Sequence, residues 1–464
     1  MSNPGEEDTT PITPGPALVA TLAGRLAAGC KPTQDWRIGT EHEKFGFRLD
    51  RLSPPPYQPD GIRDILAAMA AEGAESWQPI ADGGNLIGLK GHGPAEGGSI
   101  ALEPAGQFEL SGAPLATLHD TAREMDAHFT ALRAVAEPRG IGFAPLGFHP
   151  TATREQMPWM PKSRYAIMRR YMPEVGSLGL DMMLRTCTVQ VNLDFASEAD
   201  MRRKLQVSLA LQPVATALFA NSPFRDGRPS GLLSTRAHIW TDTDRARSGM
   251  KPVFFEPGFG FERYADWVLD VPMYFASRPE GLVDAAGLSF RRWIAGEEPR
   301  LAHLTPTLGD FDDHLTTVFT DVRLKRFLEM RGADAGTPAM MIAQAALWTG
   351  LLYDEAALAA AEALVRRHPW PDYVALRAEV PATALATPWQ GGTLRDLARD
   401  MLAIAADGLA ARACRDAGGE DERRFLEPLG EIVGGGPTQA EHWLQRYHGA
   451  WHGETDRIWS EAAV

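Results

Sequence analysis

Three segments of this chain place carboxylate or amide side chains at every second residue, inside stretches whose other residues predict buried strands. The pairs are Glu41 and Glu43, Gln107 and Glu109, and Gln190 and Asn192. A spacing of two puts both side chains of a pair on the same face of a strand. Acids gathered on a partly buried face repel one another and are costly to desolvate unless cations offset them. The pattern therefore predicts strands of one sheet that share a cation-binding face.

Two further acids extend this pattern. Residues 326–331 repeat the spacing with Glu329 and Arg331. Glu103 precedes Pro104 and Gly106, which predict a bend or bulge that redirects the neighbouring side chains. Carboxylate and amide oxygens are the hard ligands that Mg²⁺ prefers. Acids spread over so many segments predict several Mg²⁺ ions rather than one.

Two other interpretations of these acids remain open. The alternating side chains could form the solvent-facing side of an edge strand, because such polar faces are common in antiparallel sheets. They could also include the two acids of a glycoside hydrolase, which needs only two carboxylates at a set separation. The acids and amides exceed what a two-acid hydrolase requires, so we expect a metal-binding face.

Several arginines predict that the metal-bound ligand is an anion. Arg164 lies among apolar residues, and Arg236 and Arg247 lie in residues 234–249, close to an Ile-Trp pair. A planar guanidinium can grip a carboxylate or phosphate with two parallel hydrogen bonds, although a structural salt bridge is the alternative for each arginine. Arg331 shares a strand face with Glu329, so we expect it to reach phosphates bridged by a Glu329-bound metal.

The order of the predicted helices and strands along the chain favours an α+β fold with a largely antiparallel sheet, because they mix without a regular βαβ alternation. Residues 17–28 predict a helix, residues 38–49 a strand, and the turn chemistry at 82–85 a hairpin. A capping box at 197–200 predicts the start of another helix, which Pro213 should kink or end.

The domain organisation predicted from the sequence is simple. The acidic, Pro-rich residues 1–16 predict a disordered tail. Residues 17–464 predict a single catalytic domain, and its part from about 339 to 464 is rich in Ala-containing helices. We see no internal repeat.

Composition and missing motifs exclude several classes of function. A net charge of -14 argues against a nucleic-acid partner, and no apolar run approaches the roughly 18 residues of a membrane span. Cys30, Cys187 and Cys414 are too scattered for a zinc motif or a disulfide framework, and the N-terminal segment is not basic and then apolar, so we expect a cytoplasmic protein. The nucleotide motif GxxxxGK[ST] is missing. An ATP site would have to come from the metals and the sheet.

Long phrases of the chain closely resemble the glutamate–cysteine ligases of the plant and proteobacterial type. These phrases lie at residues 38–47, 102–114, 182–192, 220–223, 238–244, 269–275 and 322–334. The resemblance runs from about residue 17 to the C-terminus. It implies a glutamine-synthetase-like fold, in which a curved antiparallel sheet forms a funnel surrounded by helices. It also implies an ATP- and Mg²⁺-dependent enzyme that joins the γ-carboxylate of glutamate to the amine of cysteine, the first step of glutathione biosynthesis.

The resemblance also implies a role for each candidate residue. The metal-site residues would be Glu41, Glu43, Glu103, Glu109, Gln190 and Glu329. Arg164 and Arg236 would recognise glutamate, and Tyr274 would lie near the cysteine pocket. Arg331 would face the transferred phosphate, and Lys90 and Arg247 are weaker candidates for contact with the nucleotide or its phosphates.

The resemblance leaves three points to test. Plant members carry regulatory cysteine pairs, whereas the matching positions here are Ala122 with Ile342 and Ala285 with Arg300, which argues against a plant-type disulfide switch. We expect small-molecule partners, with the protein a monomer or homodimer. A related ligase that joins glutamate to another amine, and a metal or nucleotide binder without turnover, remain alternatives.

Overall fold

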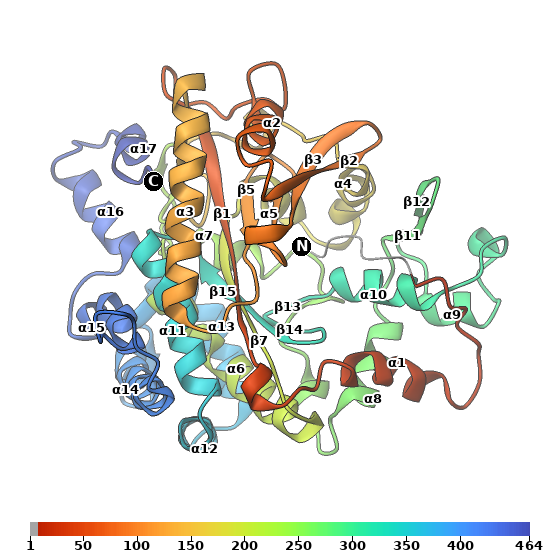
Figure 1. Ribbon diagram of the computed structural model, residues 1–464. Helices are drawn as coiled ribbons and strands as arrows, with labels where there is room; N and C mark the ends of the chain where they lie inside the picture. The colour runs from red at the N-terminus through yellow and green to blue at the C-terminus, as the bar shows by residue number, and fades with distance from the viewer. Residues whose placement is uncertain (1–7) are drawn as a thin grey trace.

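The computed structural model describes residues 8–464, and a nine-stranded sheet runs through its centre (Figure 1). The strands follow the order β14-β15-β7-β1-β5-β4-β3-β2, and β6 pairs with β1. All pairings in this sheet are antiparallel, so the predicted α+β class is confirmed. The strands are β1 (Ile38–Arg48), β2 (Trp77–Asp82), β3 (Asn85–Gly91), β4 (Ser99–Leu102), β5 (Phe108–Ser111), β6 (Ile141–Ala144), β7 (Thr188–Leu193), β14 (Val322–Leu324) and β15 (Leu328–Asp334).

Helices surround this sheet, and those that follow β15 form a separate group on one side of the molecule (Figure 1). The helices before β15 are α1 (Leu18–Ala27), α2 (Ile62–Glu72), α3 (Leu118–Ala136), α4 (Ser163–Val175), α5 (Gly179–Arg185), α6 (Glu198–Leu218), α7 (Thr235–Ile239), α8 (Phe261–Leu269), α9 (Phe290–Ile294) and α10 (Leu308–Thr316). The helices after β15 are α11 (Pro338–Leu352), α12 (Glu355–Val365), α13 (Trp370–Thr383), α14 (Leu394–Arg412), α15 (Glu427–Val433), α16 (Gln439–His448) and α17 (Ile458–Glu461).

Alternation along β7 separates the two faces of the sheet. Val189, Val191 and Leu193 are fully buried in the core that includes residues of α6 and α11. Gln190 and Asn192 therefore point to the opposite face, because successive side chains of a strand alternate. The apolar side chains of the strand pack the sheet against its helices. The polar side chains on the opposite face are available to form a site.

Strand β1 continues the same division. Glu41 stands opposite Gln190 of β7, and Glu43 stands opposite Glu109 of β5. On the other face, the Lys44 Nζ atom lies 3.1 Å from His42 Nδ1 and 2.8 Å from His128 Nε2. His42 therefore faces away from Glu41 and Glu43, as the alternation along the strand requires.

Two local predictions differ from the structure. Of the tail expected at 1–16, residues 1–7 lie outside the described residues, but Pro11 forms a β-bridge with Thr307 and the Ile12 N–H donates to the Pro306 carbonyl at 2.8 Å. The reason is that the apolar Ile12 side chain is buried, at 6% exposure, against the rest of the chain. Helix α6 also continues through Pro213 to Leu218, since residues 213–218 are almost wholly buried and their packing offsets the roughly 3 kcal/mol that an interior proline costs.

The helices can be compared with the length and apolar character that a membrane-spanning helix needs. Within residues 8–464, none of them is both long enough and apolar enough to cross a bilayer.

Candidate functional site

The acids predicted from the sequence meet on one face of the sheet, in a cleft with about 100 Å³ of space for water-sized groups. Strands β1, β5 and β7 contribute most of its acidic and amide wall. Five of the six predicted metal-site residues line it, namely Glu41, Glu43, Glu103, Glu109 and Gln190. The turn between β4 and β5, where Gly106 adopts a φ of +83°, brings Glu103 to the same wall.

Burial and mutual repulsion shift the acidity of the central carboxyl groups. Burial, reinforced by the charges of Glu109 and Glu103, raises the pKa of Glu43 well above its usual range. Burial and the neighbouring acids raise the pKa of Glu109 to about 8. The Thr188 N–H donates to Glu43 Oε2 at 2.9 Å, and the Asn192 side chain donates to Glu41 Oε1 at 2.9 Å. A cation bound between these carboxylates would relieve their repulsion.

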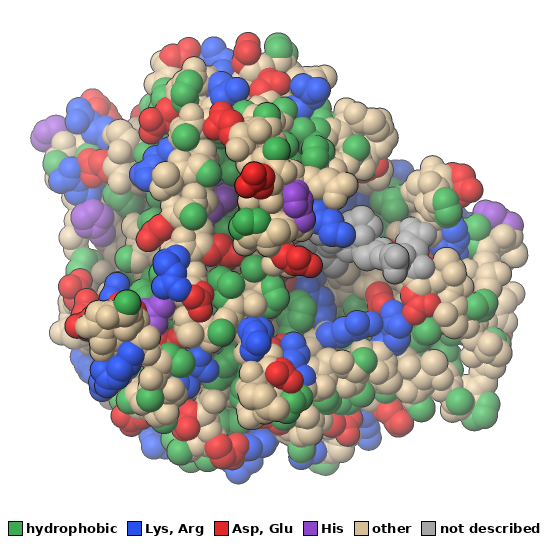
Figure 2. All heavy atoms as spheres, viewed as in Figure 1, with side chains coloured by type: hydrophobic (Ala, Val, Ile, Leu, Met, Phe, Trp, Pro, Cys, Tyr) green, Lys and Arg blue, Asp and Glu red, His purple; other side chains and the backbone are tan. Residues whose placement is uncertain are grey.

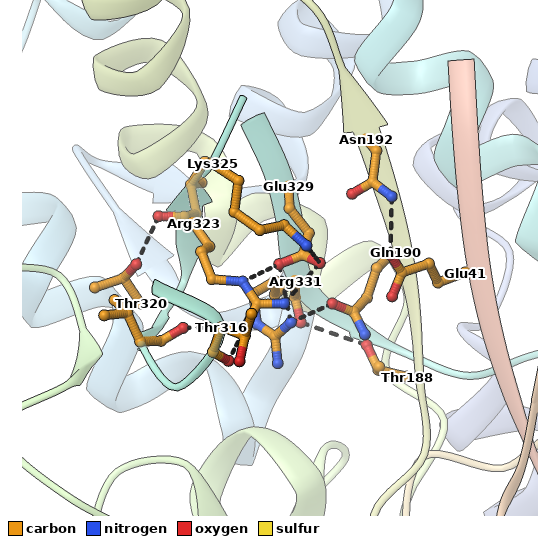
Figure 3. A network of polar contacts seen from close by, with 12 residues as sticks. Glu41, Thr188, Gln190, Asn192, Thr316, Thr320, Arg323, Lys325, Glu329 and Arg331 are labelled. Carbon is orange, nitrogen blue, oxygen red and sulfur yellow. Dashed lines mark hydrogen bonds and ion pairs between the residues drawn. The ribbon is translucent and has the colours of Figure 1, made fainter. Parts of the chain in front are cut away.

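Glu329, the sixth predicted metal-site residue, lies beside the cleft in a cluster of cations (Figure 3). Arg323 of β14 holds both of its carboxylate oxygens, with Nε 2.5 Å from Oε2 and Nη2 2.8 Å from Oε1. Lys325 Nζ lies 3.4 Å from Oε1, and Arg331 Nη1 lies 3.1 Å from Oε2. Although burial acts to raise it, these three charges hold the pKa of Glu329 well below its usual range.

Arg331 connects this cluster to the acidic strands. Its Nη1 atom donates to the Gln190 Oε1 atom on β7 as well as to Glu329 (Figure 3). Arg331 and Arg323 both line the cleft, whereas Glu329 does not. In this structure the cations therefore stand between Glu329 and the open space.

Arg164 and Arg236 line the same cleft as the acids, as their predicted role requires. The Arg164 guanidinium lies over the Phe275 ring, 5.4 Å from its centroid. Arg236 is 3% exposed, and its Nη2 donates to the Arg331 carbonyl at 2.8 Å. Helix α7 positions Arg236, because the Ser234 hydroxyl caps the helix and also donates to Asp334 at 2.9 Å.

The donor set fits Mg²⁺ in its chemistry. The Glu103 Oε1 atom is buried without a hydrogen-bond partner among residues 8–464, and burial together with the neighbouring acids raises the pKa of both Glu43 and Glu109. Within the same residues, no group of three or more His, Cys, Asp or Glu side chains is gathered closely enough to hold a metal ion. Because Mg²⁺ often takes only one or two carboxylates and completes its shell with water and phosphate, this wall suits an ion that arrives with a phosphate ligand.

Three predicted site residues lie away from the cleft walls. Tyr274 is fully buried, and its hydroxyl donates to Asp244 at 3.2 Å. Arg247 is also fully buried, paired with Asp244 at 2.6 Å and stacked 3.7 Å over the Tyr274 ring. Lys90 is exposed on β3. Arg247 and Tyr274 satisfy each other and Asp244 inside the protein, and Lys90 points to solvent. Their assignment to substrate contacts stays a prediction.

Sequence reasoning missed Arg323 and Lys325 as site residues. Arg323 is the middle residue of β14 and Lys325 directly follows the strand, so the two have a spacing of two, like the acids. The segment 322–334 contains Arg323 and Lys325 at this spacing, but only Glu329 and Arg331 were predicted there as site residues.

Positive charge also gathers outside the cleft. In the view of Figure 2, the surface is hollowed to the right of centre, and Lys and Arg side chains lie along the lower margin of that hollow.

Comparison with known protein families identifies the family of this chain. The model of the family described as glutamate-cysteine ligase family 2 (GCS2) matches residues 37–461. The chain belongs to this family. The family predicted from the sequence is therefore confirmed.

Curated relatives in the family match nearly the whole chain. A chloroplastic glutamate–cysteine ligase of Brassica juncea is 51% identical over 452 residues, covering 96% of this chain and 85% of the relative. One from Medicago truncatula is 49% identical over 460 residues, covering 99% and 88%. These names contradict the cytoplasmic location expected from the sequence, because they assign the relatives to chloroplasts. The expectation rested on the scattered cysteines and on the composition of the N-terminal residues.

A solved structure supports the fold. A glutamate–cysteine ligase from Francisella tularensis in complex with AMP aligns with a TM-score of 0.52 and 11% identity, covering 92% of this chain and 87% of that chain. The sheet of this family member is open, with β14 and β2 at its edges, and helices surround it. The predicted glutamine-synthetase-like fold is confirmed.

Proposed function

We propose that this family member uses ATP to join the γ-carboxylate of L-glutamate to the amine of L-cysteine, as the first step of glutathione biosynthesis. The observation that carries the proposal is the cleft itself, where four glutamates face Arg164, Arg236, Arg323 and Arg331. Such a cleft suits a phosphate-bearing ligand beside a carboxylate. The names of the curated relatives and the AMP bound to the structural neighbour support the same chemistry.

We propose that Mg²⁺ is held by residues of the acidic wall, namely Glu41, Glu43, Glu103, Glu109, Gln190 and Glu329. When bound, it would neutralise phosphate charge and polarise the phosphoryl group that is transferred. Glu329 would have to exchange part of its contact with Arg323, Lys325 and Arg331 for that ion. The three released cations would then remain near the phosphates.

The arginines of the cleft supply the positioning. Arg164 and Arg236 grip the carboxylate of glutamate, and the burial of Arg236 strengthens that contact. Arg331 and Arg323 stabilise negative charge on the phosphoryl group as the glutamate γ-carboxylate attacks it. The product of this step is γ-glutamyl phosphate, and ADP leaves.

The second step needs no nucleophile from the protein. The acceptor amine attacks the γ-carbonyl carbon, the C–O bond to phosphate breaks, and the amine loses a proton. Arg331 remains in place to hold the departing phosphate, since its guanidinium lies at the wall of the cleft beside Gln190. The role of the chain is to align the two substrates and keep their charges compensated.

An ADP-release assay with glutamate and Mg²⁺, with and without cysteine, tests the proposal. We expect ADP release to require both amino acids, with γ-glutamylcysteine as the product. The nearest alternative is a ligase that joins glutamate to another amine, and it predicts faster ADP release with a different member of an amino-acid panel. A hydrolase predicts turnover without ATP, and a binder without activity predicts none.

We propose further that residues 17–464 act as a single catalytic domain. The largest hydrophobic core supports this, because it joins residues from α1, the sheet and the helix-rich region from α11 to α16. Assembly as a monomer or homodimer stays a prediction.

A further inference from the structure

A second cavity adjoins the cleft. It lies between α6, α7 and α13, residues 319–321 and the irregular part of β15 at Arg331 and Gly332, and it offers about 40 Å³ to water-sized groups. Arg236, Trp240, Phe319 and Arg331 line both spaces, so the two share a wall. We call the smaller space the side chamber.

The side chamber contains hydrogen-bond donors that the protein does not use. Gln212 Nε2, Arg236 Nε and Trp240 Nε1 are buried, and none has a hydrogen-bond partner among residues 8–464. The Gln212 amide is oriented by its other end, because Oε1 accepts the Gly332 N–H at 2.9 Å. Gln212 is 1% exposed and Arg236 is 3% exposed, so water outside the protein does not satisfy these atoms. Three unused donors in one small space are what a missing acceptor group would leave behind.

The charges of the chamber define that acceptor. Its lining includes three guanidinium groups, from Arg236, Arg331 and Arg377, and one carboxylate, Asp321. Arg377 already pairs with Asp321 through two contacts of 2.5 and 3.0 Å. The remaining lining is cationic and rich in donors, so it suits an oxyanion. The guanidinium, amide and indole donors around this space match a single carboxylate at the end of a larger ligand.

The proposed reaction supplies two α-carboxylates, one on each amino acid. Arg164 lines only the cleft with the acids, and Arg377 lines only the side chamber. Two carboxylates held at a single guanidinium would repel each other, whereas separate sites on either side of Arg236 would not. The glutamate γ-carboxylate has to face the acidic wall, so its partner must approach from another side of the cleft. The side chamber opens on such a side.

We propose that the side chamber binds the α-carboxylate of the acceptor amino acid, with Gln212 and Trp240 as its donors. This inference rests on the proposed function. It adds a reason why the enzyme would accept an amino acid in preference to an amine that has no carboxylate. An amine that lacks a carboxylate would leave the Gln212 and Trp240 donors unsatisfied. Cysteine should therefore be preferred over its decarboxylated analogue, cysteamine.

The Gln212→Glu substitution tests this most cleanly. The new side chain has nearly the same shape and keeps an oxygen for the Gly332 N–H, but it replaces the free donor with a negative charge. We expect kcat/KM for cysteine to fall by roughly tenfold or more, since a donor to a charged group is lost and a repulsion is added. The value for cysteamine, and the KM for glutamate, should stay within about twofold. Where cysteamine turns over too slowly, its inhibition constant against cysteine replaces kcat/KM.

A matched control is available on the same helix. Gln206 of α6 lies outside both cavities and donates to the Phe254 carbonyl at 2.8 Å, so Gln206→Glu makes the same chemical change away from the chamber. Its preference for cysteine over cysteamine should match that of the unsubstituted protein. Trp240→Phe is a second test, because it keeps the ring and removes the unused Nε1 donor. It should reduce the same preference, and thermal melting of each variant confirms that it folds.

Other results would overturn the inference. Equal loss of cysteine and cysteamine turnover in Gln212→Glu would mean that the chamber does not recognise the carboxylate. A raised KM for glutamate alone would assign the chamber to glutamate, and a changed inhibition by inorganic phosphate alone would assign it to that product. If the unsubstituted protein forms no dipeptide from glutamate and cysteine, the proposed function fails first and the inference fails with it.

Discussion

Glu43 on β1 and Glu109 on β5 stand directly opposite each other on the acidic face of the sheet. Like charges at facing positions of neighbouring strands destabilise a sheet, and here burial adds to the effect by raising the pKa of both groups. Both acids lie in the acidic wall of the cleft. Strain of this kind is expected where a protein keeps a place for a bound cation.

Removing one of these acids should therefore stabilise the protein while impairing its activity. Glu109→Gln relieves the repulsion with Glu43, so we expect the free energy of unfolding without Mg²⁺ to rise by about 1 kcal/mol. The same change should lower kcat for ADP release at least about 100-fold and shift its Mg²⁺ dependence to higher concentrations. Chemical denaturation and a Mg²⁺ titration of activity measure the two effects.

Glu124→Gln is the control for this substitution. Glu124 lies on α3 outside the cleft, although burial also raises its pKa, to about 7. It should leave the Mg²⁺ dependence of activity unchanged. A Glu109→Gln protein with normal activity and a normal Mg²⁺ titration would remove this acid from the site.

Arg323→Lys tests the residue that sequence reasoning missed. Lysine keeps the charge but cannot hold both oxygens of Glu329, as Arg323 does at 2.5 and 2.8 Å. We expect a loss of about 1 to 3 kcal/mol in unfolding free energy and roughly a tenfold or larger fall in kcat. Arg203→Lys, at a half-exposed ion pair with Glu355 of α12, should change neither by a comparable amount. Equal effects of the two substitutions would argue against a special role for Arg323.

Arg236→Lys should mainly weaken glutamate binding. Its Nη2 atom already donates to the Arg331 carbonyl, so the remaining edge of the guanidinium is the part that can hold a carboxylate. We expect the KM for glutamate to rise about tenfold or more, with a smaller change in the KM for ATP. Steady-state kinetics at saturating cysteine measure both constants. An unchanged KM for glutamate would refute the assignment.

His149 should contribute to acid sensitivity. It is fully buried, and its Nδ1 atom accepts the Ala152 N–H at 3.1 Å, which requires an unprotonated nitrogen. Burial, with the nearby Arg185 charge, lowers its pKa to about 3. Since the unfolded chain binds this proton near pH 6.5 and the folded chain does not, stability is full above that pH and declines as the pH falls towards 3.

The decline from one such group is at most about 1.4 kcal/mol per pH unit. His149→Asn keeps an acceptor for the Ala152 N–H but cannot titrate. We expect its unfolding free energy to fall less steeply between pH 6.5 and 4.5 than that of the unsubstituted protein, in denaturant titrations at each pH. Parallel pH profiles would show that His149 does not carry the effect.

The acidic face could be predicted from the sequence because its signal is local. A spacing of two fixes the face of a strand, so the grouping of Glu41 with Glu43 needed no knowledge of the fold. The pairing of Glu43 with Glu109 depends on which strands are neighbours, and only the sheet order establishes it. The clustering of Arg323 and Lys325 on Glu329 likewise depends on the antiparallel register of β14 and β15.

Other outcomes depended on burial that no local pattern reveals. Arg247 and Tyr274 carry chemical groups that suit a substrate, but the fold places them together inside the protein, where each satisfies Asp244. The helix through Pro213 and the ordered contact at Ile12 have the same origin, since long-range packing outweighs a local preference. The side chamber could not have been anticipated, because its donors come from α6 and from α7 with its C-terminal residue Trp240, and only the fold brings these segments together.

The most direct test of the proposed chemistry follows oxygen from substrate to product. Glutamate labelled with ¹⁸O in its γ-carboxylate is turned over with ATP, Mg²⁺ and cysteine, and the released phosphate is analysed by mass spectrometry. Attack of the γ-carboxylate on ATP predicts one ¹⁸O atom in the phosphate for each molecule of γ-glutamylcysteine formed. Unlabelled phosphate alongside dipeptide formation would contradict the γ-glutamyl phosphate route, and ADP release without dipeptide would contradict the ligase itself.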